Sequence, residues 1–268
     1  MKEIEFYKMV ASGNDFVVID NRKNVVKDAA RFSREVCRPH TGVGADGVLL
    51  FEPSKKADYR VRILNPDGSE AEACGNGFRC TALLGHEKFG FGARQKFESI
   101  SGIIEAEIKN GTVRVQLADP SGFKDREEIE VGGRKLHYSF VNTGVPHVVI
   151  FVEGLEKIPV NEIGSEIRYH ARFKPAGTNV NFVAVTGPGE IEVRTYERGV
   201  EHETLACGTG TSAAAIASVR AGYVKPPVKV KTKSGEVLLV DFSQKSNRVE
   251  KIFLTGGAKL LFEGRLDF

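Results

Sequence analysis

The chain has 268 residues, of which 41% are hydrophobic and 27% charged, and its formal net charge is +3. This is the composition of an ordinary globular protein, and the length allows one large domain or two of common size. The small net charge gives no electrostatic case for binding nucleic acid or an anionic membrane, and no apolar run is long enough to span a bilayer.

The first half of the chain predicts a series of strands and helices. A helix is expected over residues 28–38, with Asp28 as its N-cap and with Phe32 and Val36 on its buried face. The glycine-rich segment 42–47 precedes a strand rather than a helix, so it is not a dinucleotide-binding fingerprint. Strands are expected within 4–20, around a turn at 11–14, and at 48–51, 60–64, 103–108 and 112–117, the last two joined by the hairpin signal Asn110-Gly111.

The second half repeats this order. It predicts a hairpin-like start at 141–152, a helix from Asn161, and strands at 181–185, 191–196, 228–232 and 237–242. Individual segments also correspond: Asp28 with Asn161, Ser101-Gly102 with Ser234-Gly235, and, with a slip of two residues, Gly13–Ile19 with Gly144–Ile150. Self-similarity at one long period indicates two homologous halves that meet across a cleft.

The clearest repeat is a cysteine followed by Gly-x-Gly. Cys74-Gly-Asn-Gly precedes a predicted helix over 78–89, and Cys207-Gly-Thr-Gly precedes one over 211–223, at an offset of 207 − 74 = 133 residues. A helix N-terminus holds an anion and lowers the pKa of a thiol. The second helix is apolar on nearly every side and is expected to be buried all round.

Two thiols on opposite walls of a site favour proton transfer. One, as a thiolate, takes a proton from a carbon atom, and the other, as a thiol, gives one from the opposite face, which inverts the stereocentre. Backbone N–H groups at the two helix starts would stabilise the carboxylate of an amino acid that loses its α-hydrogen.

Several residues also have an ordinary structural interpretation. Cys37 and Cys80 lack the Gly-x-Gly context and are predicted to be small buried hydrophobes. The four cysteines contain no CxxC, so neither a disulfide framework nor a structural zinc site is indicated. The other structural alternatives are a solvated loop for His147, a surface ion pair for Glu197 and Arg198, and turn positions for Asn14, Asn65 and Asn179.

Six motifs along the whole chain resemble those of the diaminopimelate epimerase family. They are Gly13-Asn-Asp-Phe, Thr41-Gly-Val-Gly-Ala-Asp, Asn65-Pro-Asp-Gly-Ser-Glu, Ala73-Cys-Gly-Asn-Gly-Phe-Arg, Gly177-Thr-Asn-Val-Asn-Phe and Tyr196-Glu-Arg-Gly. The resemblance implies conversion of LL-diaminopimelate to the meso form, a step towards lysine and the bacterial cell wall, without pyridoxal phosphate or metal. It also implies two pseudo-symmetric domains that close over the substrate.

The resemblance assigns roles by position. It implies that Cys74 and Cys207 are the acid/base pair and that His147 lies near the site. The implied substrate contacts are Gly75, Asn76, Gly208 and Thr209 for the reacting carboxylate, Asn14 and Glu197 near the reacting amine, and Asn65, Asn179 and Arg198 at the distal end. Two positions depart from the family pattern: Gly47 stands where some members have a substrate-facing Gln, and Val145 where many have Asn.

These observations predict an α+β fold of two pseudo-symmetric domains, each a curled, mainly antiparallel sheet wrapped around a central helix. The expected domains are 1–117 with 258–268, carrying Cys74, and 118–257, carrying Cys207. We expect no cofactor and no metal, diaminopimelate as the small-molecule partner, and neither nucleic acid nor membrane; a homodimer is compatible with the sequence. The N-terminus has no signal-peptide apolar region, so a cytoplasmic location is expected.

Three other functions remain open at this stage. A two-cysteine racemase for another amino acid, such as a proline racemase, would share Cys207-Gly-Thr-Gly-Thr-Ser, although Asn65, Asn179 and Arg198 argue against a small substrate. A cofactor-independent isomerase fold also hosts other chemistry, because fold does not fix function. In a third class, Cys74 and Cys207 would form a redox switch, which would show no racemisation with or without reductant.

Overall fold

A computed structural model of the chain describes residues 3–245 and 248–268, so Met1, Lys2, Ser246 and Asn247 lie outside the described residues. Internal contacts divide the chain into two units, Met1–Gln116 with Thr255–Phe268, and Leu117–Leu254. Within the described ranges, no helix combines the length and the apolar character needed to cross a membrane.

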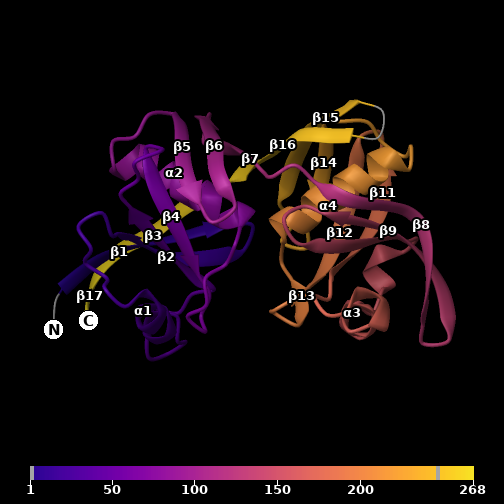
Figure 1. Cartoon of the computed structure of the whole chain (residues 1–268), viewed down its shortest axis with the longest axis horizontal. Helices are drawn as coiled ribbons and strands as arrows, with labels where there is room; N and C mark the ends of the chain where they lie inside the picture. The colour runs from indigo at the N-terminus through magenta and orange to yellow at the C-terminus, as the bar shows by residue number, and fades with distance from the viewer. Residues whose placement is uncertain (1–2, 246–247) are drawn as a thin grey trace. The chain divides into compact units, whose positions relative to one another are not determined.

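The first unit is a mixed sheet curled around one helix, α2 (Gly75–Lys88) (Figure 1). Its strands are β1 (Glu3–Ala11), β2 (Asn14–Asp20), β3 (Gly47–Glu52), β4 (Tyr59–Leu64), β5 (Arg94–Ser99), β6 (Gly102–Lys109), β7 (Thr112–Gln116) and β17 (Lys259–Asp267). They pair in the order β17–β1–β2–β3–β4–β5–β6–β7, and only β2/β3 and β4/β5 among these pairs are parallel. Because α2 contacts β1, β2 and β3 as well as β6 and β7, the helix lies inside the curl.

Local signals explain where the two helices of this unit begin. The helix α1 (Ala29–Val36) begins where predicted, because the Asp28 side chain accepts a hydrogen bond from the Arg31 N–H. Its Phe32 and Val36 are buried in the core, which confirms the predicted helix face. The helix α2 begins three residues earlier than predicted, since the glycine-rich turn already belongs to it.

The strand β5 was not predicted, and its burial pattern explains the omission. Its inward positions include Gln95, which is 3% exposed. The amide of Gln95 donates to Ala82 O at 3.0 Å and to Gly92 O at 2.9 Å, and its oxygen accepts from Tyr59 Oη. A polar side chain whose hydrogen bonds are all made can occupy a core position, and this removes the hydrophobic alternation that marks a strand.

The second unit has the same plan around α4 (Gly208–Arg220) (Figure 1). Its other elements are β8 (Ser121–Val131), β9 (Arg134–Asn142), β10 (Pro146–Phe151), η1 (Leu155–Lys157), α3 (Val160–Arg168), η2 (Ala171–Phe173), β11 (Asn179–Gly187), β12 (Glu190–Glu197), β13 (His202–Thr204), β14 (Val228–Lys231) and β15 (Val237–Lys245). The strand β16 (Arg248–Gly257) contains the boundary between the units. Residues Gly208–Ser218 of α4 are buried, as predicted for a helix apolar on every side.

Strand pairing in the second unit reproduces that of the first. The order is β8–β9–β10–β11–β12–β14–β15, with β13 added beside β12, and β10/β11 and β12/β14 are parallel. The parallel pair β2/β3 aligns Phe16 with Gly47, and the parallel pair β10/β11 aligns His147 with Asn179. The predicted α+β fold of two repeated halves is therefore confirmed.

The hairpin β8/β9 is the largest element that the sequence-based prediction missed. Most of β8 is exposed, and apolar alternation is limited to its end, at Ile129 and Val131. The turn itself, Gly132-Gly133, has positive φ at both residues (57° and 71°), which is the conformation of a two-residue hairpin loop. That dipeptide, followed by the alternating Leu136, Tyr138 and Phe140 of β9, was the available signal for this hairpin.

Candidate active site

Cys74 occupies the N-cap of α2. Its backbone is extended (φ −148°, ψ 107°), and its sulfur accepts a hydrogen bond from the Gly77 N–H at 3.4 Å. Gly75 and Asn76 form the buried first turn that follows. A thiol at this end of a helix lies at the positive end of the dipole, which stabilises its thiolate form.

Asn14 reaches the same thiol from β2, with 3.8 Å between Cys74 Sγ and Asn14 Oδ1. The orientation of this amide follows from Asp46, whose carboxylate accepts from Asn14 Nδ2 at 2.8 Å and from the Asp15 N–H at 3.0 Å. Because an ionised carboxylate only accepts, the amide nitrogen faces Asp46 and the amide oxygen faces Cys74. Asp46 is thus a supporting residue that the sequence-based prediction did not identify.

A buried arginine supports the other side of this turn. Arg79 is 0% exposed, and its Nη2 donates to Ser12 Oγ at 2.6 Å and to Asn76 Oδ1 at 2.7 Å. Ser12 lies in the β1–β2 turn with φ 54°, next to Gly13 and Asn14. One guanidinium therefore ties the loop that carries Asn14 to the first turn of α2.

Asn65 and Asn14, two predicted site residues of this unit, differ in their local structure. Asn65 lies in an exposed turn, where Nδ2 donates to Ser69 Oγ at 2.9 Å, so the structural alternative of a turn position holds for it. Asn14 is instead the first residue of β2. At Gly47, a Cβ would lie 2.8 Å from the carbonyl oxygen of Leu64, so the Gln of some family members would require the backbone to shift here.

Cys207 is the N-cap of α4 and is more buried than Cys74, with 7% of its surface exposed. Its sulfur lies 3.4 Å from Thr209 Oγ1. The carbonyl oxygen of Thr209 accepts from Thr143 Oγ1 at 3.1 Å, which fixes the first turn of α4 to the β9–β10 turn. Gly208 is the first residue of this buried turn.

Asn179 links three segments beside this helix. Its Nδ2 donates to Pro146 O at 3.1 Å, and its Oδ1 accepts from the Arg198 N–H at 2.8 Å. Arg198 also donates from Nη1 to Ala176 O at 3.0 Å, while Glu197 Oε2 accepts from Thr204 Oγ1 at 3.0 Å. Asn179 begins β11, so the turn alternative for it is wrong.

His147 lies in β10 and is 0% exposed, so the alternative of a solvated loop residue is wrong. Burial lowers the pKa of His147 to about 3, and the positive charge of Arg198 adds to this lowering. The imidazole is therefore neutral at neutral pH. Its Nδ1 lies 3.2 Å from Nδ2 of Asn181, a buried residue that the sequence-based prediction did not single out.

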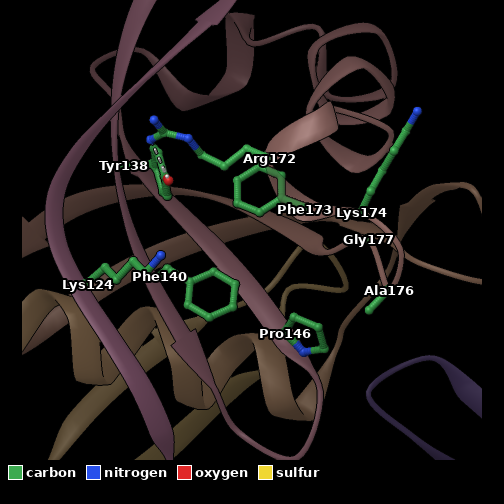
Figure 2. A pocket seen from close by; sticks show the side chains of 9 residues that line it. All are labelled: Lys124, Tyr138, Phe140, Pro146, Arg172, Phe173, Lys174, Ala176 and Gly177. Carbon is green, nitrogen blue, oxygen red and sulfur yellow. Dashed lines mark hydrogen bonds between the residues drawn. The ribbon is translucent and has the colours of Figure 1, made fainter.

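The second unit also has a cavity of about 190 Å³ between β9 and η2 (Figure 2). Arg172 at its edge is already engaged, since Nη1 donates to Glu128 O at 2.8 Å and to Tyr138 Oη at 3.2 Å. Figure 2 shows the Lys174 side chain extending away from the rings. The lining residues are Lys124, Tyr138, Phe140, Pro146, Arg172, Phe173, Lys174, Ala176 and Gly177, so the walls are mainly apolar.

Several of the predicted residues lie at the two helix N-termini. In the first unit Asn14, Gly75 and Asn76 accompany Cys74, and in the second Gly208 and Thr209 accompany Cys207. Cys37 and Cys80 are 3% and 0% exposed, which confirms that they are buried core residues. In the described part of the chain, no group of three or more His, Cys, Asp or Glu side chains is placed to hold a metal ion.

Comparison with known proteins identifies the family. The sequence profile of diaminopimelate epimerase matches residues 6–121 and 139–261. The chain belongs to the diaminopimelate epimerase family. It is 47% identical to the diaminopimelate epimerase of Aquifex aeolicus, over 98% of each chain, and 43% identical to that of Archaeoglobus fulgidus, over 98% of this chain and 96% of the relative.

Solved structures show how widely this fold is used. A phenazine biosynthesis protein of the PhzF family from Bacillus anthracis superposes with a TM-score of 0.76 at 17% identity, over all of both chains. A hydroxyproline epimerase from Agrobacterium vitis superposes with a TM-score of 0.73 at 18% identity, over 98% of this chain and 92% of that one. At these identities the likeness establishes the fold that the diaminopimelate epimerase family shares with them.

Proposed function

We propose that this chain is a diaminopimelate epimerase, which interconverts the LL and meso forms of diaminopimelate without an added cofactor. Membership of the family, with 47% identity to the Aquifex aeolicus diaminopimelate epimerase across almost the whole chain, supports the substrate. The observation that carries the chemistry is the repeated cysteine: each unit places one thiol at the N-cap of its buried central helix.

The proposed reaction is a proton transfer between two thiols and one carbon atom. One cysteine, as a thiolate, takes the hydrogen from the α-carbon, so that an S–H bond forms as the C–H bond breaks. The electron pair left on carbon then takes a proton from the other cysteine on the opposite face. Each turnover therefore exchanges the protonation states of Cys74 and Cys207 and inverts the stereocentre.

The binding roles are also part of the proposal. The N–H groups of the first turns of α2 and α4, at Gly75, Asn76, Gly208 and Thr209, hold the reacting carboxylate. Asn14 and Glu197 contact the reacting amine, and Asn65, Asn179 and Arg198 bind the distal end. His147 supports the site from β10.

Existing hydrogen bonds limit what Asn179 contributes. Its amide already bonds Pro146 O and the Arg198 N–H, so one amide hydrogen and one oxygen lone pair remain for a ligand. We therefore assign to Asn179 both a structural hydrogen-bond pair and a ligand contact. Arg198 likewise has donors left beyond its bond to Ala176 O.

We further propose that the two units act as the two domains of the enzyme and close over the substrate, which excludes water from the carbanion. Scattering from the protein with and without a bound inhibitor should show compaction on binding. An unchanged scattering profile would contradict closure. The cytoplasmic location and the homodimer stay predictions from the sequence.

The decisive experiment is an assay in deuterated water with LL-diaminopimelate and no added pyridoxal phosphate or metal. Early product should carry deuterium at the inverted carbon, while unreacted substrate keeps its hydrogen, because the thiol that receives the substrate hydrogen exchanges slowly when buried. Cys74→Ala and Cys207→Ala should each abolish inversion, whereas the core variant Cys80→Ser keeps deuterated product formation in whatever fraction folds.

Three outcomes would change the assignment. Early product that retains the original hydrogen indicates a single base moving between faces. Racemisation of L-proline without reaction of diaminopimelate indicates the related racemase class. No inversion of either substrate in the presence of reductant indicates a redox module.

A further inference from the structure

Asn181 is a buried side chain between the Cys207 helix and His147. It lies two residues after Asn179 in β11, on the same face of the strand, and is 0% exposed. Its Nδ2 lies 2.9 Å from Val148 O and 3.2 Å from His147 Nδ1, and its Oδ1 accepts from Thr195 Oγ1 at 3.0 Å. A Cβ on Gly210 would overlap the same Oδ1, so Asn181 also contacts the first turn of α4.

The hydrogen bonds fix which way this amide points. The Val148 carbonyl can only accept, so the NH₂ group of Asn181 must face it. A flipped amide would place two acceptor oxygens against each other. The second hydrogen of the same NH₂ group then points to His147 Nδ1, which must offer a lone pair.

This fixes the tautomer of His147. A neutral imidazole carries one N–H, and because Nδ1 accepts, the proton is on Nε2. Nε2 is buried and has no hydrogen-bond partner among the residues that the structure describes. Buried donors are rarely left without an acceptor, so this N–H is available to an acceptor from outside the described residues.

The equivalent positions of the first unit show that the fold does not require this pair. In the register of the parallel strands, Phe16 stands where His147 stands, and Leu49 where Asn181 stands. Leu49 packs its Cδ2 3.1 Å from the place where a Cβ on Gly77 would be, as Asn181 packs on Gly210. The same topology therefore holds an apolar pair under one cysteine helix and a polar pair under the other.

We propose that Asn181 is a positioning residue that holds His147 as the Nε2–H tautomer, so that His147 acts during turnover as a hydrogen-bond donor to an anionic group in the occupied site, and not as a base. The donor role rests on the proposed epimerase function. The tautomer itself does not.

The test is the ¹⁵N spectrum of the histidine rings in the labelled, full-length protein, without ligand, at neutral pH. Long-range ¹H–¹⁵N correlations distinguish an N–H nitrogen from one with a lone pair, and His147→Gln assigns the signal. We expect an N–H at Nε2 and a lone pair at Nδ1. A proton on Nδ1 in the wild-type protein would overturn the proposal.

Variants then separate positioning from structural support. Asn181→Asp offers His147 Nδ1 an acceptor and should move the proton to Nδ1, whereas Asn181→Leu should leave a mixture of tautomers. Thr195→Val removes only the anchor on Oδ1 and serves as a milder variant. In each folded variant kcat should fall with the fraction of the Nε2–H tautomer, while KM changes less.

A double-mutant cycle completes the design. In the His147→Gln background, Asn181→Leu should lower kcat much less than it does in the wild type, since the residue that it positions is gone. An equal fold-loss in both backgrounds would show a merely structural role. Wild-type protein that shows the expected tautomer but never inverts diaminopimelate would reject the epimerase function and leave the Asn181–His147 assignment intact.

Discussion

Asn181 Oδ1 occupies the space that a side chain on Gly210 would need, because a Cβ at Gly210 would overlap that oxygen. At Gly77, the equivalent place in α2, an added Cβ would lie 3.1 Å from Leu49 Cδ2. The two glycines of the repeated motif thus admit different neighbours. The space beside Gly77 is filled by the flexible end of the Leu49 side chain. The space beside Gly210 is filled by the Asn181 amide, which hydrogen bonds hold on both sides.

Gly210→Ala should therefore destabilise the protein more than Gly77→Ala. Overpacking against a fixed group costs about 1–3 kcal/mol. Leu49 can turn its methyl group away, and alanine favours a helix over glycine by roughly 1 kcal/mol, so Gly77→Ala should be close to neutral. Urea unfolding of the two variants measures the difference, and equal losses would contradict this account.

The cysteine repeat shows how much of the site the sequence could predict. Cys74 and Cys207 each stand in a local pattern, a thiol before Gly-x-Gly and a helix, and the structure places both at helix N-caps. Asn181 also stands in a quoted motif, two residues after Asn179. Period-two alternation puts both on one strand face, yet only the fold reveals that His147 lies opposite.

The unpredicted parts share a physical cause. Gln95 takes a core position because Tyr59, Ala82 and Gly92 satisfy its amide, and two of these partners, Tyr59 in β4 and Ala82 in α2, come from other elements. Arg79 is buried in a helix for the same reason, with Ser12 from a distant turn. Hydrophobic periodicity cannot foresee a polar core residue whose partners are distant in sequence.

The buried His147 should make stability depend on pH in a defined window. Its pKa is about 3 in the folded protein and 6.5 in the unfolded chain, so the unfolded chain binds the proton first as the pH falls. This contribution is fully present above pH 6.5 and is lost progressively between pH 6.5 and 3. At about 1.4 kcal/mol per pKa unit, the loss amounts to a few kcal/mol.

Chemical unfolding at a series of pH values tests this dependence. His147→Gln should flatten the fall of the unfolding free energy below pH 6.5, while the exposed His202→Gln should keep the wild-type slope. Parallel curves for wild type and His147→Gln would mean that the ring is protonated in the folded protein or accessible to water.

Arg79 should be difficult to replace, even by lysine. Its guanidinium joins Ser12 Oγ and Asn76 Oδ1, and a single ammonium on a different stem does not reproduce that geometry. Arg79→Met leaves both partners buried without their hydrogen bonds. Each such loss lowers the free energy of unfolding by about 1–3 kcal/mol. Thermal and urea unfolding should show a clear loss for Arg79→Lys and a larger one for Arg79→Met.

The matched control for Arg79 is Arg94→Met. Arg94 has an 86% exposed side chain and pairs with Glu107 on the neighbouring strand. Exposed ion pairs contribute about 0–1 kcal/mol, so this variant should stay close to wild type. A comparable loss at both positions would show that the buried bonds of Arg79 add nothing beyond a surface pair.

Oxidation should provide an independent test of the two-thiol proposal. If Cys74 and Cys207 act on opposite faces of one carbon atom, their sulfur atoms come within disulfide reach when no substrate separates them. Thiols at helix N-termini also react more readily than Cys37 and Cys80, which lie at the C-cap of α1 and inside α2. Mild oxidant should therefore inactivate the enzyme, reductant should restore activity, and diaminopimelate should protect against the loss.

Non-reducing peptide mapping of the inactive protein should find a Cys74–Cys207 link. Inactive material in which both cysteines are oxidised separately would mean that the two thiols do not meet at one carbon, and the proposed mechanism would fail.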